Sequence, residues 1–262
     1  MTDYPWDEVK KITLWYYEEL VVKLNAVLAY PLIRQAYDHS MPQAADFARA
    51  LFSDRDISGG EFPSPMLAAF ERLQAAGVCC WTDLLAKVAT REALIGFIEQ
   101  QHLVFEEVIQ VLNYLLRWAL PFYTASRELL DHDDPQEMAN YAILKQHRLM
   151  CSFELLKQGR TGADRLALAQ QTDLPHEFVS SLVQRADIAR LPYVRRKTIL
   201  PVCRAGYDSL AKIAAADLSK MEQDMEAYFQ HMQGKSFADY KSVIILRGLV
   251  IGAKALPGIL QP

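Results

Sequence analysis

Residues 186–218 read ADIARLPYVRRKTILPVCRAGYDSLAKIAAADL, and the positions of proline and glycine in this stretch decide the fold. Apolar residues recur at helical spacing before and after a Leu191-Pro192 step, and again beyond an Ala205-Gly206 step. Because proline cannot continue a helix and glycine readily ends one, the stretch predicts short helices joined by tight turns.

The same helical spacing extends outward over nearly the whole chain. Apolar positions between residues 6 and 29 recur at steps of three and four, which predicts one long amphipathic helix that ends before Pro31. No window of five or more residues alternates in the manner of a half-buried strand, so the predicted fold class is all-α. Further helices are predicted over residues 42–52, 66–76, 82–89, 92–100, 105–119, 122–130, 136–157, 164–171, 176–189, 196–204, 209–215, 219–230 and 238–254.

An internal repeat becomes visible when the chain is shifted against itself by 71 residues. The identical pairs are Leu103 and Leu174, Glu106 and Glu177, Val108 and Val179, Leu120 and Leu191, Pro121 and Pro192, and Leu129 and Leu200. A weaker correspondence places Gly77 beside Gly206 and Leu85 beside Leu210, with a spacing that differs by one helical turn. We therefore predict that residues 92–130 and 163–201 share one helix order; chance similarity of Leu- and Ala-rich hairpins is the alternative.

Residues 164–218 resemble a divergent helix-hairpin-helix module found in a bacterial family described only as a domain of unknown function. The resemblance is carried by the Leu191-Pro192 turn, the helix after it, the Ala205-Gly206 step and the Ser209-Leu210 helix start. In such modules two glycines let the backbone approach a phosphate, and the resemblance implies that kind of contact. Here residues 193–195 are Tyr-Val-Arg, and both glycines are absent.

The expected architecture is an irregular multi-helix domain with two related helical units and a helix-hairpin-helix-like segment. Residues 1–60 form an N-terminal helical region without resemblance to any family, and residues 61–135 form the first helical unit. Residues 136–262 form the second unit, which includes the divergent hairpin and a C-terminal helix.

Charge is distributed unevenly in this chain. The formal net charge is -4, which has the wrong sign for a protein whose whole surface follows phosphates. Between Ile188 and Tyr207, however, the chain has five basic residues and no acidic one. The candidate nucleic-acid-binding residues are therefore Arg190, Arg195, Arg196, Lys197 and Arg204. The competing interpretation is a solvated helix surface with cations at helix ends.

The sequence predicts no catalytic residue, metal ligand or cofactor. Its cysteines, Cys79, Cys80, Cys151 and Cys203, have spacings that suit neither a disulfide framework nor a zinc site, so we expect reduced thiols. The acidic run at residues 131–134, Asp-His-Asp-Asp, precedes Pro135 and is interpreted as a helix N-cap. The aromatic run at residues 15–17 is expected to lie in the core.

Localisation is predicted from two features. The N-terminus has Asp3, Asp7 and Glu8 where a secretory signal would have positive charge, and no apolar run reaches the length of a membrane span. We therefore expect a cytoplasmic protein that does not bind a membrane.

Function is predicted only by class. The favoured hypothesis is a non-enzymatic binding or scaffold protein that acts through helical surfaces on a protein partner or on itself, with no small-molecule substrate identified. The alternative is weak, sequence-independent nucleic-acid binding by the basic turn. A more distant alternative is an enzyme of the helix-hairpin-helix glycosylase kind, for which Asp208 and Lys197 are weak candidates.

Overall fold

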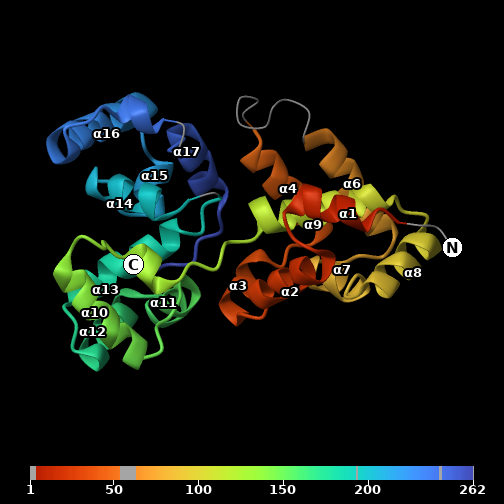
Figure 1. Ribbon diagram of the computed structural model, residues 1–262, viewed down its shortest axis with the longest axis horizontal. Coiled ribbons are helices and arrows are strands. Elements are labelled where there is room, and N and C mark those ends of the chain that lie inside the picture. Colours follow the sequence, from red (N-terminus) through yellow and green to blue (C-terminus); the bar gives the residue numbers. More distant parts are fainter. Residues whose placement is uncertain (1–3, 54–62, 193, 242–243, 262) are drawn as a thin grey trace. The chain divides into compact units, whose positions relative to one another are not determined.

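The computed structural model describes residues 4–53, 63–192, 194–241 and 244–261. The fold is all-α: the described residues contain helices and two isolated β-bridges but no strand. In this part of the chain, none of the helices combines the length and the apolar character needed to span a bilayer. The chain divides into two compact units, residues Met1–Leu120 and Pro121–Pro262, which are described separately below (Figure 1).

Unit 1 is built around buried aromatic rings. Among its largest fully buried side chains are Tyr17, Tyr37, Phe70, Trp81 and Tyr114, and the last three are in mutual ring contact. Its helices are α1 (Trp6–Thr13), α2 (Tyr17–Leu28), α3 (Pro31–Tyr37), α4 (Met41–Leu51), α6 (Pro63–Ala75), α7 (Trp81–Lys87), α8 (Arg91–Gln101) and α9 (Phe105–Tyr114), the last continued by a π-helical turn, Leu115–Ala119.

Unit 2 contains the segment that resembles a helix-hairpin-helix. Helix α17 packs on α15 and α16, as Figure 1 shows, and Gly252 of α17 lies directly against Leu191. A Cβ atom at Gly252 would come within 2.9 Å of the Leu191 Cδ2 atom, so a larger residue there would require the Leu191 side chain to shift. The helices of unit 2 are α10 (Pro135–Gln146), α11 (Ser152–Gln158), α12 (Gly162–Thr172), α13 (His176–Ile188), α14 (Arg196–Arg204), α15 (Leu210–Ala214), α16 (Leu218–Gln233) and α17 (Leu246–Ala255), with 3-10 turns at Ser126–Leu129 and Phe237–Tyr240.

The two copies of the repeat share the helix order that the 71-residue offset predicts. When 71 is added to their residue numbers, the bounds of α7 become those of α11 and the bounds of α8 become those of α12. The first residue of α9 likewise corresponds to the first residue of α13. Residues His102 and Asp173, which also correspond, end α8 and α12 in the left-handed conformation with φ of 52° and 54°. A short helix follows each Leu-Pro step, a 3-10 turn in the first copy and α14 in the second. The repeat therefore extends upstream of the segments predicted from sequence.

A third, partial copy begins at Gly206. A residue with positive φ ends the leading helix in each copy, and the N-cap of a short helix follows three residues later; the pairs are Gly77 and Cys80, Arg148 and Cys151, and Gly206 and Ser209. The structure thus aligns Leu210 with Trp81 rather than with Leu85. The spacing after the glycine is conserved, and the difference of one turn expected from sequence is wrong.

Four predicted helices are interrupted or shortened, and the one expected over residues 238–254 is replaced by the Phe237–Tyr240 turn and α17, which begins at Leu246. The helix expected over residues 6–29 breaks at Leu14, with φ of 68°, and the helix expected over residues 136–157 breaks at Arg148, with φ of 58°. Neither break contains glycine or proline, the residues that usually signal one. Of residues 122–130 only Ser126–Leu129 are helical, because the backbone before them is extended and Ala125 pairs with Cys151.

The division of the chain differs from the expected boundaries at residues 60 and 135. Helix α4 of the N-terminal region packs against α6, and α2 packs against α7, so residues 1–60 share a unit with the segment that follows. The Ser126–Leu129 turn packs instead against α13 and α14 of unit 2. Nonlocal packing therefore places the division at the first Leu-Pro step, between Leu120 and Pro121.

None of the four cysteines is in a disulfide, and they differ in accessibility. Cys79 is exposed, Cys151 is buried, and burial raises the pKa of Cys203 to about 12. Because the thiolate is the reactive form, we expect Ellman's reagent to modify about one thiol rapidly in the native protein and all four in denaturant. A Cys79→Ser variant should lose the rapid phase. Fewer than four thiols in denaturant would contradict the expected reduced state.

His39 makes the stability of unit 1 depend on pH. Its ring centroid lies 6.3 Å from that of Tyr37 and 5.4 Å from that of Phe47, and burial lowers its pKa below the ordinary 6.5. Folding therefore favours the neutral ring. The neutral His39 ring therefore contributes fully to the unfolding free energy of unit 1 above pH 6.5. This contribution is lost as the pH falls through the lowered pKa of His39. Measured by urea unfolding, the free energy of unfolding should fall between pH 7 and pH 5. This fall should be absent in His39→Phe and present in the control His231→Gln.

Candidate functional site

The fold separates the five basic residues that were predicted to contact nucleic acid. Arg195 and Lys197 are exposed at the start of α14, and Arg196 is partly exposed. Arg190 is 2% exposed and lies in the interior of unit 2. Arg204 is at the other end of α14, where it forms an ion pair. The basic run in the sequence is therefore not one continuous basic surface.

Arg190 has a structural role in the interior of unit 2. Its Nε donates a 2.8 Å hydrogen bond to Asp187, and its Nη1 donates a 2.9 Å bond to the Pro257 carbonyl oxygen. The Arg190 and Asp187 side chains are 1% and 9% exposed. This arrangement neutralises the buried charge and ties the C-terminal segment to the end of α13. Arg190 is therefore not available for a phosphate, which corrects its prediction as a binding residue.

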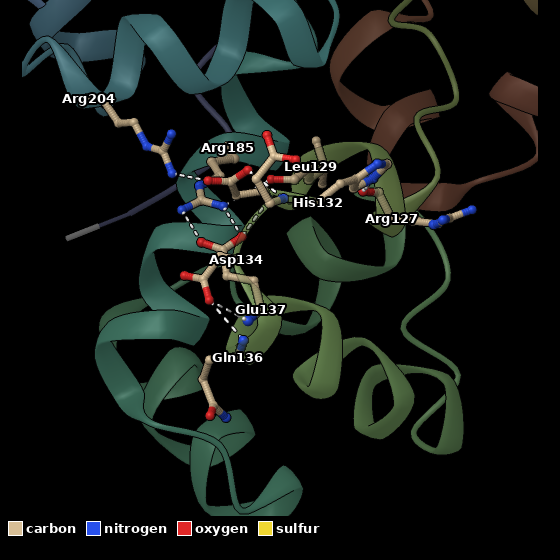
Figure 2. Close-up of polar contacts among 10 residues, drawn as sticks. Arg127, Leu129, His132, Asp134, Gln136, Glu137, Arg185 and Arg204 are labelled. Carbon is tan, nitrogen blue, oxygen red and sulfur yellow. Dashed lines mark hydrogen bonds and ion pairs between the residues drawn. The ribbon is translucent and has the colours of Figure 1, made fainter. Parts of the chain in front are cut away.

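A second polar cluster joins the acidic turn at residues 131–134 to α13 and α14 (Figure 2). Arg185 of α13 makes a bidentate pair with Glu137 at 2.8 and 2.9 Å and also donates to the Leu129 carbonyl oxygen at 3.0 Å. The paired side chains are each 12% exposed. Arg204 of α14 pairs with Asp131, whose backbone N–H donates to Glu137 at 2.7 Å.

The Asp131 carboxylate is held in its charged form. Its partial burial pushes its pKa up, but the hydrogen bonds from Arg204 and from the Asp133 backbone N–H, together with the nearby charges of Arg204 and Arg196, have the larger combined effect. The pKa of Asp131 therefore lies below its ordinary 3.8. Two of the predicted nucleic-acid-binding cations, Arg196 and Arg204, thus face an acidic group of their own unit.

The rest of the acidic turn serves the start of α10. The Asp134 side chain accepts hydrogen bonds from the Gln136 and Glu137 backbone N–H groups, as the N-cap interpretation requires. The His132 Nε2 atom lies 2.9 Å from the Arg127 carbonyl oxygen. Among the described residues no three His, Cys, Asp or Glu side chains are grouped so that they could hold a metal ion.

The segment after the Leu191-Pro192 step is anchored by an apolar side chain. Val194 is 2% exposed and its backbone N–H donates to the Leu191 carbonyl oxygen at 3.3 Å, while the Arg195 guanidinium lies 4.2 Å from the centre of the Phe122 ring. Tyr193 lies outside the described residues. Val194 therefore packs inward, as an apolar residue between polar neighbours is expected to do.

The two residues considered for an enzymatic role are not brought together. Lys197 lies in the first turn of α14, and Asp208 lies beyond the other end of that helix. The Asp208 carboxylate pairs with Lys212 at 2.9 Å, an arrangement common on helix surfaces. No acid–base pair is therefore formed by these residues.

The most unusual surface lies at the turn between α1 and α2, which the sequence placed in the core. Leu14 is 68% exposed, Trp15 37% and Tyr16 50%, and Val22 of α2 is 67% exposed. Of the aromatic run, Tyr17 alone is buried. We refer to Leu14, Trp15, Tyr16 and Val22 as the α1–α2 surface. Apolar side chains clustered in this way mark interaction sites more often than isolated ones do.

Tertiary contacts hold this turn in place. The Thr13 hydroxyl bonds to the Val9 carbonyl oxygen at 2.8 Å and receives the Trp15 backbone N–H at 3.2 Å. The Arg117 guanidinium donates to the Ile12 carbonyl oxygen at 3.3 Å, which satisfies a carbonyl at the end of α1. Leu14 then adopts its left-handed φ of 68° with its side chain in solvent. The signal available in the sequence was three consecutive aromatic residues after a leucine.

Comparison with known proteins bears on unit 2 alone. No curated protein matches the chain, and no solved structure matches it. Residues 140–243 match the model of a family described as a domain of unknown function, DUF4332. This match begins inside α10 and ends after the Phe237–Tyr240 turn, so it includes the Leu191-Pro192 step. Less than half of the chain is thus similar to a family, and that family has no known function.

Proposed function

We propose that this protein is a non-enzymatic, cytoplasmic binding module that holds a protein partner on the α1–α2 surface. The exposed leucine at position 14 carries the proposal. A side chain other than glycine at a φ of 68° costs about 1 kcal/mol, and solvent exposure of Leu14 recovers none of it through burial. The same conformation lets the Leu14 backbone N–H bond to the Lys10 carbonyl oxygen at the end of α1, so the backbone serves the fold while the exposed apolar side chain is left for a partner.

Helix α2 supports the same proposal. Its inward face buries Leu20, Leu24 and Leu28, yet Val22 and Ala26 on the outward face are apolar and exposed. Val22 and Ala26 are one helical turn apart, so they lie side by side on this exposed side of α2. The turn is in contact with α2, because the Lys23 ammonium of α2 lies 3.8 Å from the centre of the Trp15 ring.

Variants of the turn should separate binding from stability. We expect Trp15→Ser to weaken binding of the partner by tenfold or more, because a central tryptophan commonly supplies 2 kcal/mol or more of binding energy. Leu14→Gly should also weaken binding while changing the unfolding free energy by about 1 kcal/mol or less, because glycine removes the strain but costs chain entropy. The partner is captured from native lysate on the full chain, identified, purified and titrated by calorimetry.

Two controls match these variants. Leu166→Ser removes an apolar side chain of comparable exposure, 49%, from α12 and should leave the affinity unchanged. Replacement of Arg195, Arg196 and Lys197 by Ser, with and without nuclease during capture, tests the nucleic-acid alternative. Equal binding by wild type and Trp15→Ser, or capture that disappears with nuclease, would contradict the proposal.

A further inference from the structure

Two adjacent cysteines lie at the start of α7. Cys79 is exposed and Cys80 is partly exposed, whereas Cys151 and Cys203 belong to unit 2. The Cα atoms of neighbouring residues are about 3.8 Å apart across a trans peptide, below the range of about 4.4–6.8 Å that is usual for a disulfide. A bond between the Cys79 and Cys80 sulfurs is therefore strained and easily reduced, which suits a reversible signal better than a structural cross-link.

The Cys80 thiol is held in its protonated form by a chain of two hydrogen bonds. Its Sγ atom lies 3.3 Å from the Thr82 Oγ1 atom, and the Thr82 hydroxyl donates to the Asp38 carboxylate at 2.6 Å. A hydroxyl group has one hydrogen, so Thr82 accepts from Cys80. In the reduced protein Cys80 is thus oriented toward Thr82, and Cys79 is open to solvent.

The Cys80 backbone is part of the fold. Cys80 is the N-cap of α7 in an extended conformation, with φ of -155° and ψ of -179°, and it pairs with Ser40 in a β-bridge. Adjacent side chains on extended backbone point to opposite sides, so a disulfide between the two cysteines requires the Cys80 backbone to rotate. That rotation breaks the bridge to Ser40 and takes the thiol away from Thr82.

The other end of α7 anchors α2. Val88 is the C-cap of α7, and its carbonyl oxygen accepts the 2.5 Å hydrogen bond from the Tyr17 hydroxyl group. Helix α2 also packs against α7. Because α7 has only seven residues, about two turns, a rearrangement at its start reaches the contact that supports α2 and the turn before it.

We propose that the Cys79–Cys80 pair is a reversible redox switch that loosens α7 and α2 when a low-molecular-weight disulfide oxidises it. The Cys79 thiolate attacks one sulfur of that disulfide, whose S–S bond breaks and releases a first thiolate. The Cys80 thiol then loses its proton to solvent, and its sulfur displaces the second thiolate from Cys79 as the new S–S bond forms. Two electrons pass from the cysteines to the small disulfide, and excess thiol reverses both steps.

Ellman's reagent tests the chemistry, because each step releases one coloured thiolate. In native wild type, rapid release from Cys79 should be followed by a slower second release, and mass spectrometry should find the peptide with residues 79–80 unlabelled and lighter by two hydrogens. Cys80→Ser is the matched control: its hydroxyl group can still donate to Thr82, and the label should stay on Cys79. Label that stays on Cys79 in wild type as well overturns the proposal.

Hydrogen exchange tests the effect on the fold. After oxidation of the full chain by glutathione disulfide, exchange in α7 and α2 should become about tenfold faster, as expected for the loss of a hydrogen bond and a bridge, and excess glutathione should restore it. Helix α11 is the internal control, because its N-cap Cys151 bridges Ala125 in the same way but follows Met150. Equal exchange in the oxidised and reduced protein overturns the switch.

The consequence for binding rests on the proposed function. Oxidation should weaken binding of the captured partner by wild type and leave binding by Cys80→Ser unchanged. A pair that forms no disulfide overturns the switch and leaves the protein-binding proposal intact. Disulfide formation that loosens α7, with equal partner binding by wild type and Trp15→Ser, supports the switch and contradicts the proposed function. Loosening of α7 with unchanged affinity overturns control of binding by the switch.

Discussion

Replacement of Arg185 by Met is expected to destabilise unit 2 by about 3–5 kcal/mol. The change removes the guanidinium from a bidentate pair in which both side chains are 12% exposed, and it leaves the Glu137 carboxylate inside the unit without its cation. The Leu129 carbonyl oxygen loses the same donor. A largely buried charge that has lost its partner costs more than the intact pair contributes, so the loss exceeds that of an ordinary surface contact.

A chain of two units need not unfold in one step, so the stability of each unit is measured separately. Hydrogen exchange across a urea series gives the loss of unfolding free energy in each unit. Protection in α10 and α13 should be lost at lower urea, while α6 to α9 are unaffected. Lys212→Met is the matched control: the Lys212 and Asp208 side chains are 57% and 44% exposed, so this surface pair in unit 2 should contribute about 1 kcal/mol or less. The double variant Arg185→Met, Glu137→Leu should recover most of the loss; no recovery would mean that the charge left behind is not the cause.

Replacement of Trp81 by Ala is expected to cost about 3–5 kcal/mol in unit 1. Trp81 is fully buried, and its ring lies 5.5 Å from Phe70 and 6.4 Å from Tyr114, centre to centre. Truncation opens a cavity among large rigid rings that cannot move to fill it.

Trp81→Phe separates volume from polarity at the same site. The Trp81 Nε1–H group is buried and has no hydrogen-bond partner among the described residues, so phenylalanine removes an unsatisfied donor while it keeps most of the ring. We expect this variant to lose no more than about 1.5 kcal/mol, because the smaller ring and the removed donor act in opposite directions. Urea denaturation followed by hydrogen exchange in α7 and α9 compares the two variants. Equal losses for Ala and Phe would show that the donor is satisfied in solution.

The candidate site could be predicted from sequence only in part. The basic residues before and after the Leu191-Pro192 step are adjacent in the sequence, which predicts a patch. The fold buries Arg190 against Asp187 and turns Arg204 toward Asp131, because α13 and α14 pack their faces against other elements of unit 2. The exposed turn at Trp15 was missed because a helical pattern places aromatic residues inward by default.

The sequence by itself determined the all-α fold class, most helices and the repeat. Apolar spacing specifies which residues face inward along each helix, and Gly77 and Gly206 end helices because glycine adopts positive φ without steric cost. The Leu-Pro steps at residues 120–121 and 191–192 mark corresponding ends of the two copies for a similar local reason. Each of these signals depends on one residue and its immediate neighbours.

Only the tertiary structure decided the breaks at Leu14 and Arg148 and the division of the chain at Leu120. Leucine and arginine have no local preference for positive φ, so nothing in their own sequence windows marks a helix end. At Leu14 the end of α1 is held by Arg117, 105 residues away, and α2 is anchored by a 2.5 Å hydrogen bond from the Tyr17 hydroxyl group to the Val88 carbonyl oxygen. The α1–α2 surface exists because these distant contacts outweigh the helical preference of the segment.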